Sequence, residues 1–241
     1  MPANIRENFR IEKKKLPKKD AWSHSFDKAG LSPNRQSVYF LNNTRIEVYK
    51  NMLQPDPQLL PSMKQCNKRE WQCAAISNNY LVAANLETCL LWKLEYSKVV
   101  DIAKIQIDPP KCISCLAIQE DTTSQEVLVA IGLRNREGRD NQEVQVHRIN
   151  CNTKNPIPLR QISLTGIDPR MLSFSPDGTL LACTVCGYKR DSQEQYCEQV
   201  IVHRIENPSS TSSVPIISIN FMDVSAWRYP ISAFDLLNGL P

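Results

Sequence analysis

The stretch CTVCGYKRDSQEQYC, residues 183–197, holds three of the nine cysteines of this chain. A Cys-x-x-Cys spacing occurs in structural zinc sites and in thiol–disulfide redox centres. A zinc site needs four ligands, of which Cys183, Cys186 and Cys197 would supply three. A redox centre of the thioredoxin kind needs the motif at the start of a helix. The elements that carry the cysteines therefore decide which chemistry is available.

Both Cys-x-x-Cys pairs lie in predicted strands. Cys183 and Cys186 belong to the apolar run TLLACTV, and Cys112 and Cys115 belong to CISCLAI. Residues three apart on a strand point to opposite faces, with Cα atoms roughly 10 Å apart. A disulfide requires Cα atoms within about 7 Å. We therefore expect neither pair to form a disulfide.

Reduced, packed thiols are the interpretation we favour for these cysteines, because free cysteine behaves as a small buried hydrophobe. No histidine lies nearer in sequence to the 183–197 stretch than His203, at the end of the next predicted strand. We therefore expect no bound metal and no cofactor. Cys186 and Cys197 flank a predicted hairpin, so oxidation-dependent pairing of these two stays open.

Four similar segments repeat along the chain, each with a ring side chain followed by a basic residue. They are RIEVYK (45–50), CLLWKL (89–94), VQVHRI (144–149) and VIVHRI (200–205). A second apolar run precedes each segment, and turn residues such as Ser-Pro-Asp-Gly at 175–178 separate the runs. Four short strands in every ~40–45 residues are typical of propeller blades. The sequence predicts an all-β fold: a β-propeller of four-stranded antiparallel blades, about four blades plus a partial fifth.

The stretch FSPDGTLLAC (174–183) resembles the WD-repeat family, in which a strand, this turn and a second strand recur. IEVYK and LLWKL resemble the strand that gives the family its name, and Trp92 alone matches the family's Trp outright. No Gly-His dipeptide precedes the first strand, and the Asp before the aromatic is missing. The chain thus resembles a divergent WD-repeat propeller of the fungal kind. This resemblance implies a non-catalytic scaffold for protein–protein interaction.

The predicted organisation is a basic, flexible N-terminal tail at 1–21 and a propeller at 22–241. The predicted blades span 22–60, 66–108, 110–166 and 168–222, and a partial fifth spans 223–241. Rings of the WD type usually hold more blades than four. We therefore expect a further chain or self-association to complete the propeller.

Two predicted connections between second and third strands, at 133–143 and 187–198, are longer than a propeller hairpin requires. They fall at the same topological place, so we expect them on the same face. Enlarged loops on a rigid scaffold often carry binding residues, although solvated surface hairpins are the alternative. The candidate partner-binding residues are Arg134, Arg136, Arg139, Lys189 and Arg190.

A basic residue follows the ring side chain in every repeat. These residues are Lys50, Lys93, Arg148 and Arg204. A propeller would array them around the face opposite the enlarged hairpins, where they would attract an acidic or phosphorylated ligand. Strand-end cations are also commonly just solvated.

Other functions find little support in the sequence. It has three histidines, no GxxxxGK or GxGxxG loop and no repeated Asp or Glu, so we name no catalytic residue. A net charge of +4 does not by itself indicate a nucleic-acid ligand. The alternatives are a fragment of a propeller enzyme, or a module that binds nucleic acid or phosphoinositide. With no apolar leader or membrane span visible, we expect a cytoplasmic or nuclear protein with protein partners.

Overall fold

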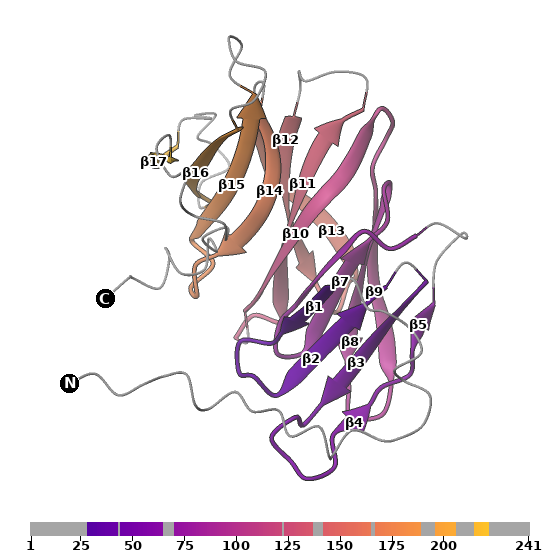
Figure 1. The fold of residues 1–241 in the computed structure, drawn as a ribbon. Helices are drawn as coiled ribbons and strands as arrows, with labels where there is room; N and C mark the ends of the chain where they lie inside the picture. The colour runs from indigo at the N-terminus through magenta and orange to yellow at the C-terminus, as the bar shows by residue number, and fades with distance from the viewer. Residues whose placement is uncertain are drawn as a thin grey trace, which may run out of the picture.

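The computed structural model describes residues 28–42, 44–64, 70–121, 123–136, 142–164, 167–188, 196–205 and 215–221. Within these ranges the chain forms seventeen strands and no helix. The strands make four antiparallel sheets that follow one another in chain order (Figure 1). Each sheet is one blade of a β-propeller, which confirms the predicted all-β fold. The predicted tail and partial fifth blade lie outside the described residues.

The blades are numbered 1 to 4 along the chain. Blade 1 contains β1 (Lys28–Leu31), β2 (Ser37–Leu41), β3 (Arg45–Lys50), β4 (Gln58–Leu59) and β5 (Met63–Lys64). Blade 2 contains β6 (Cys73–Ile76), β7 (Tyr80–Ala84), β8 (Thr88–Leu94) and β9 (Val99–Gln106). Blade 3 contains β10 (Lys111–Asp121), β11 (Glu126–Asn135), β12 (Gln142–Asn150) and β13 (Asn155–Leu164). Blade 4 contains β14 (Ile167–Phe174), β15 (Leu180–Tyr188), β16 (Tyr196–Arg204) and β17 (Ile217–Phe221).

The strands of the middle blades are apolar on both faces because each blade is packed between two others. On β11, Val127, Val129 and Ile131 are fully buried in the core shared with blade 2. Ala130 lies between them in the sequence and is buried in the core shared with blade 4. Side chains alternate between the faces of a strand. A run such as VLVAI must therefore be apolar at every position.

The ring position of the repeat faces the preceding blade. In blade 2, Trp92 lies edge-on to Trp71, with ring centroids 5.7 Å apart, in the core between blades 1 and 2. His203 of blade 4 is paired with Leu181, which belongs to the core between blades 3 and 4, and is 2% exposed. His147 of blade 3 is also buried. The two repeat histidines are thus packed between blades.

The turn from β14 to β15 has the conformation that its Ser-Pro-Asp-Gly sequence predicts. The amide of Gly178 donates to the carbonyl oxygen of Ser175 at 2.9 Å. Gly178 has a φ of 73°, a region that glycine enters without the clash of a Cβ atom. The carboxylate of Asp177 accepts from the Thr179 amide at 3.1 Å and from the hydroxyl of Ser175. The tight turn closes the hairpin and leaves Asp177 exposed at the edge of the blade.

Candidate functional site

The turns between the first and second strands join neighbouring blades through polar contacts. Between blades 1 and 2, the amide of Asn34 donates to Oδ1 of Asn78 at 3.0 Å. Between blades 2 and 3, the carboxylate of Glu120 accepts from the Ser77 hydroxyl at 3.0 Å and from the Asn79 side-chain amide at 2.7 Å. These contacts fix the position of each turn against the next blade, all on one face of the propeller.

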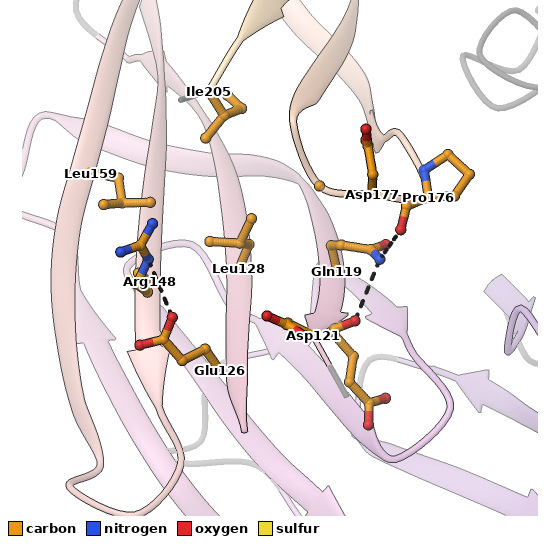
Figure 2. Close-up of a pocket in the computed structure, with 11 residues that line it drawn as sticks. Gln119, Asp121, Glu126, Leu128, Arg148, Leu159, Pro176, Asp177 and Ile205 are labelled. Carbon is orange, nitrogen blue, oxygen red and sulfur yellow. Dashed lines mark hydrogen bonds and ion pairs between the residues drawn. The ribbon is translucent and has the colours of Figure 1, made fainter. Parts of the chain in front are cut away.

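On this face a groove of about 380 Å³ opens between blades 3 and 4 (Figure 2). Its apolar lining consists of Leu128 and Leu159 from blade 3 and Ile205, which comes directly after β16 of blade 4. Gln119 spans the two blades, because its Nε2 donates to the Pro176 carbonyl oxygen at 2.7 Å. The charged residues of the lining are Glu120, Asp121, Glu126, Arg148 and Asp177.

Hydrogen bonds within their own turns orient two of the groove carboxylates. Asp121 accepts from the Thr123 hydroxyl and the Ser124 hydroxyl, both at 2.6 Å. These hydrogen bonds hold the pKa of Asp121 well below its usual value, and the hydrogen bond from the Ser124 hydroxyl has the largest effect. The hydroxyl of Ser175 and the groups of Thr179 lower the pKa of Asp177 in the same way. Both carboxylates are therefore negatively charged at neutral pH.

Arg148 provides the positive charge in the groove lining. Its Nε lies 3.5 Å from Oε2 of Glu126, and the two side chains are 48% and 31% exposed. Four carboxylates against one guanidinium give the lining a net charge of −3 at neutral pH. The apolar residues lie between the charged groups, with Leu128 at the centre of Figure 2. This combination suits the aliphatic stem and cationic head of a lysine or arginine side chain.

The four residues of the predicted basic ring occupy matched strand positions, but at least three of them have partners. Lys50 pairs with Ser37, the first residue of β2, and Lys93 pairs with Tyr80, the first residue of β7. The ammonium of Lys50 donates to the Leu94 carbonyl oxygen at 2.8 Å. Lys93 lies 3.7 Å from Glu95, and Arg148 is paired with Glu126 in the groove. Arg204 is exposed at the end of β16. A ligand for this ring stays a prediction.

The predicted hairpin cations are described in part. Arg134 is exposed at the end of β11, and its Nε lies 3.4 Å from the sulfur of Cys112. Arg136 is exposed just beyond this strand. Arg139, Lys189 and Arg190 lie outside the described residues. The groove is on the opposite face from these hairpins, so the structure does not bring the predicted binding residues into it, Arg148 excepted.

The cysteines of the two Cys-x-x-Cys pairs lie in strands, as expected. Cys183 is buried in the core between blades 3 and 4, and burial raises the pKa of its thiol well above the usual value. Cys112 and Cys115 are buried and carry free thiols. In the ladder between β15 and β16, Cys186 pairs with Glu198 and Cys197 pairs with Gly187, so the backbone positions of the two cysteines lie one row apart in the register.

Sequence reasoning missed the groove, although the sequence contained a signal for it. Glu120 and Asp121 form an adjacent acidic pair at the end of a predicted first strand, and Asp177 lies in the corresponding turn of the next blade. In a propeller, turns at this place in successive blades are neighbours. Carboxylates in two consecutive turns therefore indicate a negative site between two blades.

The described part of the chain contains neither a cluster of metal ligands nor a helix of membrane-spanning length. No three His, Cys, Asp or Glu side chains among the described residues are placed to hold a metal ion together. No helix that is long and apolar enough to cross a membrane occurs in the same ranges.

Comparisons with known proteins give matches in structure and none in sequence. No family model matches the sequence, and no curated protein matches it at a significant level. Sqt1 of Saccharomyces cerevisiae has a TM-score of 0.52 at 14% identity, over 81% of this chain and 48% of that chain. Two structures of Hsv2 of Kluyveromyces lactis, one with its loop 6CD complete, have TM-scores of 0.46 at 14% identity, over 76% of this chain and 49% of theirs.

The chain therefore spans about half the length of the solved proteins that it matches. At an identity this low, the likeness to Sqt1 bears on the fold alone. The four consecutive blades and the Ser-Pro-Asp-Gly turn agree with that likeness. The chain therefore has a β-propeller fold, and it resembles the WD-repeat kind.

Proposed function

We propose that this chain is a non-catalytic interaction scaffold, and that the groove between blades 3 and 4 receives a basic side chain of a protein partner. The observation that carries the proposal is the groove itself, whose apolar lining is combined with a net charge of −3. Its volume of about 380 Å³ is in the range of small ligand sites. Contacts between the blades, such as the hydrogen bond from Gln119 to Pro176, hold the walls of the groove in place. Few groove side chains therefore need to become ordered when a ligand binds.

A basic ligand is favoured over a polyanion by the charges on this face. Phosphate groups would be repelled by the carboxylates of Asp121 and Asp177, which are negatively charged at neutral pH. Lys93 and Arg148, members of the predicted basic ring, already have carboxylate partners. These ion pairs reduce the positive charge that the predicted basic ring could offer to a polyanion.

Replacing Glu126 by lysine is expected to weaken the binding of basic peptides at least about tenfold, because one charge-assisted contact is lost and the net charge of the lining changes from −3 to −1. The probe is a peptide array in which one central position among apolar residues is Arg, Lys, citrulline or Glu. Citrulline keeps the shape of arginine without its charge. The unaltered chain should bind the Arg and Lys peptides above the other two, and less strongly as salt is raised.

The matched control is a double variant, Glu126→Arg combined with Arg148→Glu, in which the two partners of the ion pair change places. This double variant keeps the net charge of the groove, so it should bind the basic peptides as the unaltered chain does. Equal binding of the arginine and citrulline peptides would contradict the proposal, because the carboxylates would then contribute nothing to recognition.

The enlarged hairpins of blades 3 and 4 are a second candidate surface for the same scaffold function. The ladder of blade 3 continues as far as Leu133 paired with Glu143, and that of blade 4 as far as Tyr188 paired with Tyr196. β11 and β15 have ten and nine residues, whereas β2 and β7 have five each. The residues predicted as loop thus partly extend the strands. The strands that lead into the two hairpins, β11 and β15, end at the same side of the propeller (Figure 1).

Replacing Arg134 and Arg136 together by glutamine is expected to lower the recovery of a hairpin-bound protein at least fivefold, since two cations at one contact are lost. The measurement is quantitative mass spectrometry of proteins that the chain retains from a cell extract. Lys98→Gln with Lys104→Gln is the control, because it removes the same charge from exposed positions of blade 2. Retention of the same proteins in the same amounts by both double variants would exclude these two residues from the contact.

A further inference from the structure

The groove between blades 3 and 4 follows one row of residues across the sheet of blade 3. Each member of the row pairs with the next one across the ladders, and the members from the inner strand outward are Gln119, Leu128, Arg148 and Ile157. The first three of them line the groove. Residues that pair directly across strands project from the same face of a sheet. Ile157 therefore continues the groove lining as far as β13, the outer strand of blade 3.

Ile157 is an exposed apolar residue at the outer end of this row. It is 51% exposed, whereas Ala117, Ala130 and Val146 of the adjacent row are buried in the core against blade 4. The row of Ile157 is thus the first one that blade 4 leaves accessible. A single exposed isoleucine is common on protein surfaces. This one, however, lies two residues from Leu159 on the same strand and extends the apolar lining of the groove.

Hydrogen bonds between the two blades hold both ends of the groove. At the inner end, Gln119 donates to the Pro176 carbonyl oxygen at 2.7 Å. At the outer end, Arg160 of β13 donates to the carbonyl oxygen of Arg204, the last residue of β16. Arg160 pairs with Val146 and so belongs to the buried row next to that of Ile157. The length of the groove is therefore fixed before a ligand binds, which lowers the cost of ordering on binding.

Charge is distributed unevenly along the groove. Figure 2 shows Asp121 and Asp177 on one side of Leu128 and Arg148 on the other. The two carboxylates attract a cation, whereas the guanidinium of Arg148 repels a cation placed further outward. A basic side chain of a ligand is therefore best accommodated at the inner end. The rest of the ligand then extends outward past Arg148 toward Ile157.

The outer edge of blade 3 is unsuited to pairing with an added strand. β13 has proline at positions 156 and 158, on either side of Ile157. Proline has no amide hydrogen, so a peptide added there as a fifth strand would lack hydrogen bonds at both positions. A ligand that reaches Ile157 therefore contacts it with a side chain and crosses the edge of the sheet.

We propose that the ligand of this groove is an extended peptide segment with two anchors, a basic side chain at the inner end and a large apolar side chain that packs on Ile157. This proposal rests on the proposed function of the groove and adds the direction of the ligand. Leu128 and Ile157 lie two strands apart, roughly 10 Å at the usual strand spacing. An extended chain advances about 3.3 Å per residue. The apolar residue is therefore expected about three positions from the basic one.

A series of peptides with one arginine and one leucine in a serine–glycine background tests the second anchor. The leucine is placed one to six positions from the arginine on either side, and the reference peptide has alanine instead. Binding to the full chain is measured by fluorescence anisotropy. We expect leucine two to four positions away, on one side, to strengthen binding about fivefold, the effect of partly burying one apolar side chain. Ile157→Ser should remove this gain, and Ile157→Leu should retain it.

The matched control is Leu59→Ser, because Leu59 is also 51% exposed and lies on β4, an outer strand of blade 1. It should leave the gain from leucine unchanged. Citrulline in place of arginine separates the two proposals, since equal binding of the two peptides would contradict the basic anchor and with it the proposed function. A preserved preference for arginine without the gain from leucine, or with a gain that Ile157→Ser leaves intact, would overturn the apolar anchor alone.

Discussion

Replacing Trp71 by alanine is expected to lower the free energy of unfolding by about 3–5 kcal/mol, the range for removing a large buried aromatic side chain. Trp71 is 2% exposed and lies edge-on to Trp92, at an interplanar angle of 72°. Both rings belong to the core that joins blade 1 to blade 2. Three contributions to stability are lost: the transfer free energy of the buried indole, the packing that the resulting cavity removes, and the contact between the two aromatic rings.

The loss should be concentrated at one junction, because each blade of a repeat protein contacts only its neighbours. In chemical denaturation followed by circular dichroism, we expect the alanine variant to unfold in two steps, with blade 1 first. Trp71→Phe is the control, since it keeps an aromatic ring and removes an indole N–H that has no hydrogen-bond partner within the described part of the chain. It should cost about 1–2 kcal/mol. Equal costs for the two variants would mean that the ring contact does not hold the blades together.

The blades could be predicted from sequence because their signals are local. The short apolar runs YLVAA and TLLACTV and the turn Ser-Pro-Asp-Gly each lie within ten residues. Repetition identifies the ring position, and its orientation toward the preceding blade becomes evident once the sheets are packed. β1, with sequence KAGL, carries little apolar signal, and its sequence alone did not indicate a strand.

The groove could not be predicted because distant segments form it. Gln119 and Pro176 are separated by 57 positions, and no local pattern indicates that they meet. The partners of the basic residues are equally remote, since Lys50 binds a carbonyl oxygen of the next blade, 44 positions away. The sequence indicated where cations recur but not which of them are neutralised. That depends on the packing of one blade on the next.

Lowering the pH from 6.5 to 4 is expected to destabilise the fold by up to about 3 kcal/mol through His203. Burial, and secondarily the guanidinium of Arg160, lower the pKa of this imidazole to about 4. Both of its ring nitrogens are buried and have no hydrogen-bond partner among the described residues. Nothing in the described junction between blades 3 and 4 thus compensates a positive charge on the ring.

The direction of the effect is set by proton binding in the two states. In the unfolded chain a histidine has a pKa near 6.5, so it gains a proton as the pH falls below that value. In the folded chain His203 stays neutral until the pH approaches 4. Between these values the unfolded state binds more protons, and stability decreases as the pH is lowered. Above pH 6.5 both states are neutral and the contribution to stability is fully present.

Denaturant titrations at pH 7, 6, 5 and 4 measure this loss, and His203→Phe is the variant that should remove most of it. Aromatic rings hold the same repeat position in blades 1 and 2, at Tyr49 and Trp92, so phenylalanine suits the site. His147→Phe is the matched control. Its imidazole has a lowered pKa but contacts Gln145 through Nε2 at 3.2 Å, so a smaller part of the slope should disappear. An unchanged slope in His203→Phe would assign the acid sensitivity to other groups, because no proton would then be gained at this junction.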